Sequence, residues 1–277
     1  MRVVRYRDAG GAARRGSVES SADGDLVREL GPDGPGEVVG RLDDVALLAP
    51  CDPRTIVCVG SNYACQVEEK GRPWPEQPAL FLKAPNALAA PGQTVLRPAE
   101  VQRLEYEGEL AVVIGRTARR VTERDAMAHV YGLTCANDVT AHDWRSDGQW
   151  TRAKSADTFL PLDPWIETGD DDGPADRPRA VRTRLGDRVV QESDTGKMIF
   201  SVPEILAWVT RWITLQPGDV VLTGSPAGVG PMAPGDLVTV EIEGLGALSN
   251  PEPAGPTGSG VSSSAGAGAS ACPRALR

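Results

Sequence analysis

Cysteine and histidine are scarce in this sequence, and their scarcity excludes several kinds of site. The 277 residues include five cysteines and two histidines. The cysteine number is odd and no Cys-x-x-Cys spacing occurs, so we expect neither a disulfide framework nor a zinc knuckle. With His129 and His142 as the only histidines, a multi-histidine metal site is excluded and few histidine bases are available.

Long apolar runs and an excess of positive charge are also missing. No run approaches the roughly 20 apolar residues that a membrane-spanning helix needs. The N-terminus lacks the apolar core of a signal peptide. The formal net charge is −9 and the pI is about 4.9, which argues against non-specific binding of nucleic acid. We therefore expect a cytoplasmic protein with neither a membrane nor a nucleic-acid partner.

Composition divides the chain into three parts. Residues 1–53 predict a small, β-rich N-terminal module that ends at a pair of nearby prolines, Pro50 and Pro53. Residues 54–252 contain the stronger strand patterns and predict a larger catalytic domain. Residues 253–277 consist mainly of glycine, serine and alanine, a composition that predicts a disordered tail.

Two glutamates stand at the start of the most apolar strand pattern in the chain. Residues 110–114 are all apolar and predict a strand buried on both faces, with Glu107 and Glu109 leading into it. Residues two apart on a strand point to the same side, so these carboxylates share a face. Buried like charges are costly to desolvate, and a hard cation such as Mg²⁺ or Ca²⁺ would offset them. The alternative is a solvated strand end.

A third carboxylate and a lysine occur further along. Residues 130–136 predict another strand, which leads into Asp138, so Asp138 could join the two glutamates. Lys154 lies in a segment of mixed polarity, where a surface lysine is the simpler interpretation. The loop at 223–230 contains three glycines. It is either a plain connection between strands or a set of backbone N–H groups that bind an anionic ligand.

The clearest helix is predicted after a capping box at residues 201–204, where serine is followed three positions later by glutamate. Apolar residues then recur at helical spacing as far as Ile213. This pattern places Trp208 and Trp212 in the core.

Four motifs together resemble those of the fumarylacetoacetate hydrolase family, across residues 55–250. They are Gly-Ser-Asn-Tyr-Ala at 60–64, Tyr-Glu-Gly-Glu-Leu at 106–110, Ala-Asn-Asp-Val-Thr-Ala at 136–141 and Leu-Thr-Gly-Ser-Pro-Ala-Gly-Val-Gly at 222–230. They occur in the family's order. The resemblance implies a mainly β, α+β fold, namely a mixed β-roll with few short helices beside the small N-terminal module, in a protein that is usually a homodimer.

The resemblance also implies a set of site residues. A divalent ion, Mg²⁺ or otherwise Mn²⁺ or Ca²⁺, would be bound by Glu107, Glu109 and Asp138. Lys154 becomes an active-site cation that offsets developing negative charge. The substrate would be a small 2-oxo acid or 1,3-dicarbonyl, chelated by the ion and converted through an enolate. The implied substrate-binding residues are Tyr63, Arg145, Thr223 and Gly224.

The chain departs from the family pattern in three respects. Hydrolytic members carry a lid histidine that is followed three residues later by glutamate, and here the two positions hold Gln66 and Glu69. An amide does not titrate near neutral pH, so Gln66 cannot activate water as a base. After the metal aspartate, His142 replaces a usual arginine and Arg145 replaces a usual glutamine. Cys65 stands where aspartate is common, and we treat that change as neutral.

These departures favour enolate chemistry that needs no activated water, as in a decarboxylase, tautomerase, dehydratase or cyclase. Lys154, Gln66, Glu69 and His142 are the candidate catalytic residues. One alternative is a C–C bond hydrolase of the acylpyruvate or fumarylacetoacetate type, with His142 or Glu69 as the base. Another is a homologue that binds metal and ligand without turnover.

Overall fold

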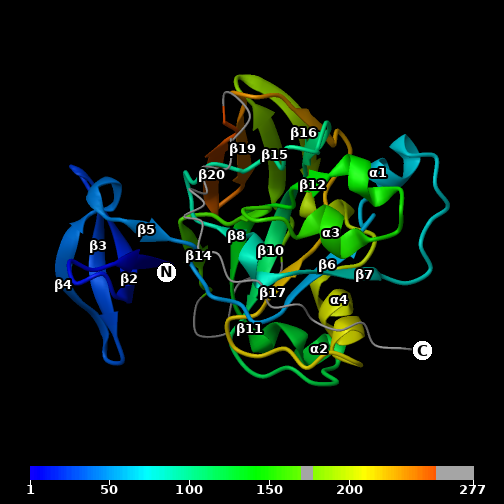
Figure 1. The fold of residues 1–277 in the computed structure, drawn as a ribbon. Helices are drawn as coiled ribbons and strands as arrows, with labels where there is room; N and C mark the ends of the chain where they lie inside the picture. Colours follow the sequence, from blue (N-terminus) through cyan, green and yellow to red (C-terminus); the bar gives the residue numbers. More distant parts are fainter. Residues whose placement is uncertain (170–176, 254–277) are drawn as a thin grey trace, which may run out of the picture.

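The computed structural model describes residues 1–169 and 177–253, and sheets dominate this part of the chain (Figure 1). A sheet of eleven strands runs through the molecule, with further sheets of four, three and two strands. All helices are short, and none in the described ranges is long and apolar enough to cross a membrane. The predicted fold class, mainly β with few short helices, is confirmed. The predicted disordered tail lies outside the described residues, apart from residue 253.

Strands outnumber helices in the described ranges. The four α-helices found there are α1 (Ala64–Glu69), α2 (Glu123–Ala126), α3 (Trp150–Lys154) and α4 (Val202–Val209). Single 3₁₀ turns are found at Leu42–Asp44, Pro85–Ala87, Met127–His129, His142–Arg145 and Thr195–Lys197. The strands are β1 (Arg2–Arg7), β2 (Ala13–Ser21), β3 (Gly24–Gly31), β4 (Gly34–Arg41), β5 (Leu47–Leu48), β6 (Ile56–Gly60), β7 (Ala79–Lys83), β8 (Leu88–Ala89), β9 (Leu104–Tyr106), β10 (Gly108–Ile114), β11 (Val130–Asn137), β12 (Thr140–Ala141), β13 (Leu160–Pro161), β14 (Trp165–Glu167), β15 (Ala180–Leu185), β16 (Arg188–Asp194), β17 (Val220–Leu222), β18 (Gly230–Met232), β19 (Leu237–Ile242) and β20 (Gly246–Pro251).

The N-terminal strands form their own small layer, at the left of Figure 1. β1 to β4 pair antiparallel in sequence order, and a separate apolar cluster of Val4, Tyr6 and Val27 is buried among them. β1 also pairs with β14, which connects this layer to the main sheet. The limits of the predicted domains remain a prediction.

β10 lies at the centre of the main sheet, and its register positions the site. All seven of its residues are buried, as expected for a strand covered on both faces. It is antiparallel to both β11 and β17. Gly108 lies opposite Asn137, so the glutamates at the start of β10 meet Asp138, which follows β11. A Cβ atom on Gly108 would lie 2.1 Å from Thr183 Oγ1, so only glycine fits at this position.

α4 begins as the sequence predicts and ends earlier. Ser201 and Glu204 form the complete capping box. The helix stops at Val209, because the chain then turns to bring Leu215 alongside Ala118. The prediction that Trp212 belongs to the core is wrong. This side chain is 62% exposed and packs edge-on against Trp208, with 4.8 Å between the ring centroids.

Candidate active site

Three buried carboxylates meet where β10 begins and β11 ends. Glu107, Glu109 and Asp138 each offer an oxygen, and these oxygens all lie within 4.8 Å of one another. The two glutamates share a face because they are two residues apart on extended backbone. Asp138 is held beside them by its backbone N–H, which donates to the carbonyl oxygen of Glu107 at 2.8 Å. The structure thus brings together the three residues that the sequence placed in a metal site.

Two buried lysines contact these carboxylates. Lys154 Nζ lies 2.8 Å from Glu107 Oε1 and also donates to Asp138 Oδ2. Lys154 is therefore not the surface lysine that its local sequence suggests. Lys83 Nζ lies 2.6 Å from the other Asp138 oxygen and also donates to the carbonyl oxygen of Val139. Sequence reasoning missed Lys83. The signal was present, because a lysine that ends an apolar strand needs an anionic partner if it is buried.

The charges in this cluster do not balance. Three carboxylates face two ammonium groups, so one negative charge remains if all are ionised. Glu109 has no cationic partner, and its Oε2 accepts only the Gly224 N–H at 2.7 Å within the described chain. Burial and then the charges of Asp138 and Glu107 hold the pKa of Glu109 well above its usual range. A divalent cation would offset this charge, and an all-carboxylate set suits Mg²⁺, Mn²⁺ and Ca²⁺.

α1 packs on the loop at 223–230 through several side chains. Gln66 is buried, and its Nε2 donates to Ser225 Oγ at 2.9 Å. The Ser225 hydroxyl in turn donates to Glu107 Oε2 at 3.3 Å. Glu69 is exposed, and its carboxylate accepts the backbone N–H of Gly228 at 3.1 Å. Gln66 therefore contacts the carboxylate cluster through one hydroxyl, whereas Glu69 fastens the outer side of the helix.

A cavity of about 490 Å³ opens onto the cluster. Its polar end contains the three carboxylates, Lys154, Gln66 and Ser225. Apolar side chains form another part of its wall, namely Val59, Pro73, Pro75, Ala79, Leu80, Phe81 and Trp150. Lys154 Nζ lies 5.0 Å from the centre of the Phe81 ring. The remaining charged lining residues are Lys70, Arg72 and Arg145. The cavity thus has a cluster of carboxylates at its polar end. Its remaining wall contains apolar side chains and three cations.

The other predicted substrate-binding residues contact the protein itself. Thr223 is buried, and its hydroxyl donates to the carbonyl oxygen of Leu110 at 3.0 Å. Gly224 adopts a φ of +94°, and a Cβ there would lie 2.8 Å from the Asn62 side chain. Tyr63 is buried as well, and its hydroxyl has no hydrogen-bond partner among the described residues. Contact of these three with a substrate remains a prediction, whereas Arg145 lines the cavity.

His142 and Glu69 line a neighbouring outer cavity of about 650 Å³ and are absent from the lining of the first. His142 Nδ1 lies 3.1 Å from Glu105 Oε2, and the other oxygen of Glu105 lies 2.7 Å from Arg103. The structure therefore separates these two candidate bases from Gln66 and Lys154.

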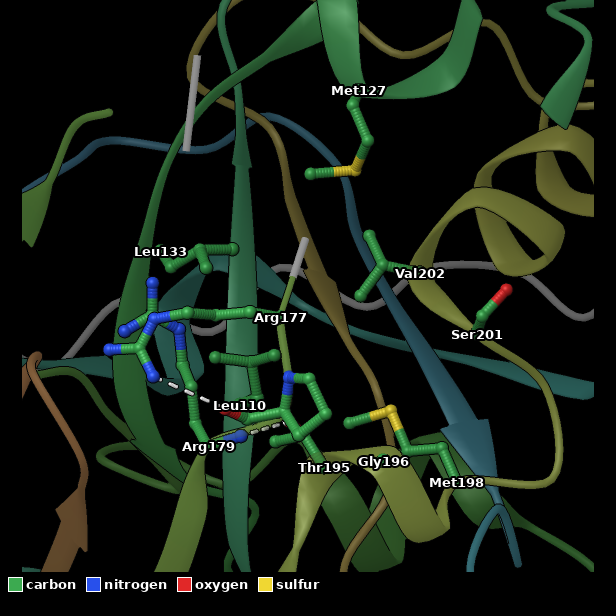
Figure 2. A pocket seen from close by; sticks show the side chains of 11 residues that line it. Leu110, Met127, Leu133, Arg177, Arg179, Thr195, Gly196, Met198, Ser201 and Val202 are labelled. Atoms are coloured by element: carbon green, nitrogen blue, oxygen red, sulfur yellow. Dashed lines mark hydrogen bonds between the residues drawn. The ribbon is translucent and has the colours of Figure 1, made fainter. Parts of the chain in front are cut away.

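A third cavity, of about 230 Å³, lies away from the carboxylates (Figure 2). Leu110 contributes to its wall and follows Glu109 on β10, so it points to the opposite face of the sheet. Met127, Met198 and Val202 add further apolar surface, and Arg179 lies at one side. None of the predicted site residues lines this cavity.

A family model and known proteins match most of this chain. A family model described as fumarylacetoacetate (FAA) hydrolase, C-terminal, matches residues 55–251. The chain is 39% identical over 219 residues to the mitochondrial oxaloacetate tautomerase fahd2 of Xenopus laevis, covering 75% of this chain and 68% of that protein. 

Two solved structures resemble the fold. One is 5-carboxymethyl-2-hydroxymuconate delta-isomerase from Mycobacterium smegmatis, with a TM-score of 0.82 and 39% identity, covering 91% of this chain and 98% of the other. The second is fumarylpyruvate hydrolase from Pseudomonas aeruginosa in complex with Mn²⁺ and pyruvate, with a TM-score of 0.68 and 31% identity. The match covers 76% of this chain and 92% of the other. This chain therefore belongs to the fumarylacetoacetate hydrolase family of enzymes.

Proposed function

We propose that this protein is a divalent-metal-dependent enzyme that converts a small 2-oxo acid or 1,3-dicarbonyl compound through an enolate, as a tautomerase, decarboxylase or related lyase. The observation that carries the proposal is the convergence of three buried carboxylates and Lys154 on one cavity. Its relatives include an oxaloacetate tautomerase and a delta-isomerase. A homodimeric assembly is part of the proposal.

Glu107, Glu109 and Asp138 would hold the ion, and Mg²⁺, Mn²⁺ and Ca²⁺ all suit their oxygens. The bound ion supplies a Lewis acid for adjacent substrate oxygens. The P. aeruginosa relative was solved with Mn²⁺, which supports a site for a hard or borderline divalent ion here.

Lys154 acts as a fixed positive charge in this proposal. Burial alone would lower its pKa, but the charges of Asp138 and Glu107 outweigh burial and raise the pKa above its usual range. The two carboxylates that Lys154 contacts thus favour its ammonium form. This ammonium group can stabilise the negative charge that develops on an enolate oxygen in the same cavity.

The lining of the first cavity favours decarboxylation over hydrolysis, because decarboxylation needs no base to activate water. Gln66 stands where the family resemblance implies a lid histidine in hydrolytic members, and its amide donates to Ser225. The ionisable lining of the first cavity comprises, within the described chain, only the three clustered carboxylates, Lys70, Arg72, Arg145 and Lys154. When a carboxylate on C3 leaves as CO₂, the electron pair of the broken C–C bond stays on the enolate. This step needs no proton from water. Hydrolysis does need such a base, and Glu69 and His142 lie in the outer cavity.

A substrate panel tests this proposal. The purified protein is assayed with Mg²⁺, Mn²⁺ or Ca²⁺ and with a chelator, on oxaloacetate-type diacids and on acylpyruvates. We expect metal-dependent decarboxylation or tautomerisation of a diacid, with acylpyruvate hydrolysis slower by about 10² or more because general-base catalysis is missing. Efficient acylpyruvate hydrolysis would favour the hydrolase. Tight binding of metal and oxalate without turnover of any compound would favour a non-catalytic homologue.

A further inference from the structure

The first cavity and the outer cavity meet at four residues. Lys70, Arg72, Arg145 and Trp150 line both of them. Three of these four shared residues are cations. The passage between the carboxylate cluster and the outer cavity is thus positively charged, although the whole chain carries a formal charge of −9.

Few carboxylates of the described chain contact these three cations. Within the described part of the chain, the side chains of Lys70 and Arg72 make no hydrogen bond or ion pair. The carboxylate nearest to Arg145 is Glu105, at 4.0 Å, and its oxygens already contact His142 and Arg103. Burial lowers the pKa of Lys70; the charge of Glu107 opposes this shift, and the positive charges of Arg145, Arg72 and Lys154 add to it. Like charges gathered in a cavity repel, and an anion would relieve that repulsion.

Arg145 is held in a defined place. Its guanidinium carbon lies 5.0 Å from the centre of the Trp150 ring, and its side chain is 17% exposed. Trp150 in turn packs against Phe81, with 5.4 Å between the ring centroids. An arginine fixed on an aromatic ring offers a planar pair of donors that matches a carboxylate.

The position of the cations also limits what they can bind. They share the first cavity with the carboxylate cluster, where the proposed function places the chelated 2-oxo acid end of the substrate. The cavity of about 490 Å³ falls within the range of ordinary ligand pockets. It leaves room for further carbon atoms beside Phe81 and Trp150 and for a second charged group.

We infer that Lys70, Arg72 and Arg145 bind the distal carboxylate of a dicarboxylic 2-oxo acid whose chelating end lies at Glu107, Glu109 and Asp138. This inference rests on the proposed function and specifies its substrate class. Lys70 caps the C-terminal end of α1, and Arg72 follows two residues later. A bound carboxylate would therefore contact the end of α1, whose Gln66 and Glu69 contact the loop at 223–230.

A matched pair of ligands tests the inference. 2-Oxoadipate and 2-oxohexanoate have the same chain length and the same 2-oxo acid end, and only the former carries a distal carboxylate. Their affinities are measured by calorimetry with the full chain and Mg²⁺, and oxalate serves as a ligand that contains the chelating end alone. We expect the wild type to bind 2-oxoadipate at least about tenfold more tightly than 2-oxohexanoate, because charged hydrogen bonds add to the affinity.

Charge-removing variants complete the test. The affinity for 2-oxoadipate should fall several-fold in each of Lys70→Met, Arg72→Met and Arg145→Met. The affinities for oxalate and 2-oxohexanoate should stay unchanged. The control is Arg211→Met, which removes the same charge from a guanidinium stacked on Trp208, outside both cavities. Equal affinities of the wild type for the two six-carbon acids, with oxalate bound, would overturn this inference alone. If oxalate itself fails to bind with Mg²⁺, the proposed function fails and the inference falls with it.

Discussion

Lys83 Nζ lies 2.6 Å from Asp138 Oδ1, and Lys154 donates to the other oxygen of the same carboxylate. Both lysines and the aspartate are buried. Asp138 is therefore fixed between two ammonium groups, which define its orientation towards Glu107 and Glu109. The two lysines differ in one respect, because Lys154 lines the first cavity and Lys83 does not. This difference predicts that Lys83 positions Asp138 and that Lys154 contacts a substrate.

Substitution of the two lysines should therefore have different consequences. Lys83→Met leaves Asp138 partly unpaired, and breaking a buried ion pair costs about 3–5 kcal/mol of stability. Lys154→Met also breaks buried contacts, but with saturating divalent metal it should fold and lose turnover by about 10² or more, because its charge faces the substrate. Denaturant unfolding and initial rates, both with metal, measure the two effects.

Lys197→Met serves as the control for both variants, since Lys197 is exposed. It should match the wild type in stability and rate. A Lys83→Met protein as stable as the wild type would contradict the positioning role. Full activity of Lys154→Met would contradict its role in catalysis.

Removal of divalent metal should destabilise the protein. Without the ion, Glu109 faces two further buried carboxylates and has no cation of its own. An ion present at about 100 times its Kd adds roughly 2.7 kcal/mol to the free energy of unfolding. For a chain of this size that energy corresponds to roughly 5–10 °C in Tm. Thermal unfolding is recorded with a chelator and again after Mg²⁺ is restored.

Glu109→Gln provides the matched variant for this measurement. The amide removes one of the repelling charges, so the variant should unfold at a higher temperature than the wild type in chelator. It should also respond weakly to added Mg²⁺, because one ligand has lost its charge. A wild-type Tm that is the same with and without metal would argue against the metal site.

The three carboxylates are the site residues whose positions follow from local backbone geometry. Glu107 and Glu109 share a face because strand residues alternate, and Asp138 follows directly from the end of a predicted strand. The capping box at Ser201 is likewise local. These features depend on neighbours within a few residues, so pattern and spacing suffice to predict them.

The contacts that the sequence could not supply join distant parts of the chain. Lys83 reaches Asp138 across 55 residues, and Gln66 reaches Ser225 across 159. The end of α4 also depends on distant pairing, because the chain turns to bring Leu215 beside Ala118. Lys70 and Arg72 have no local pattern that marks them, and only the lining that the two cavities share points to them. Such relationships require the tertiary structure.

A buried aspartate outside the site should make stability depend on pH. Asp163 is fully buried, and neither of its side-chain oxygens has a hydrogen-bond partner among the described residues. Burial raises its pKa from 3.8 to about 8, although the nearby Cys135 thiol lowers it somewhat. The folded protein thus binds a proton that the unfolded chain releases between these pH values. Asp163 therefore reduces stability as pH rises from about 4 to 8, with no further loss above 8.

Asp163→Asn should remove this slope. The stability of the variant relative to the wild type should rise with pH through that window, by up to about 1.4 kcal/mol per pH unit. Urea unfolding at several pH values measures the difference. Asp33→Asn, at an exposed position, is the control and should follow the wild type. Parallel curves for Asp163→Asn and the wild type would show that Asp163 does not carry this dependence.

In the proposed function, Gln66 limits which reactions the site supports. Its amide donates to Ser225, whose hydroxyl contacts Glu107, so it supports the cluster without exchanging protons near neutral pH. Gln66→Met keeps a similar volume and removes that hydrogen bond, and we expect only a several-fold loss in turnover of an oxaloacetate-type diacid. Gln66→His restores a titratable group three residues before Glu69. It should raise acylpyruvate hydrolysis relative to diacid conversion, by up to about 10²–10⁴ if the imidazole reaches the attacking water.

The ratio of the two activities, measured for wild type and both variants at a fixed concentration of metal, separates the reaction types. A high hydrolytic rate in the wild type would show that another residue supplies the base. Glu69→Gln and His142→Gln would then identify it, since both side chains line the outer cavity and only the true base should lower that rate by about 10² or more. A loss in Glu69→Gln would require α1 to move, because the Glu69 carboxylate accepts the N–H of Gly228 in this structure. Unchanged hydrolysis in both variants would exclude these two residues as the base, and the enolate reactions would then no longer be the favoured chemistry of the site.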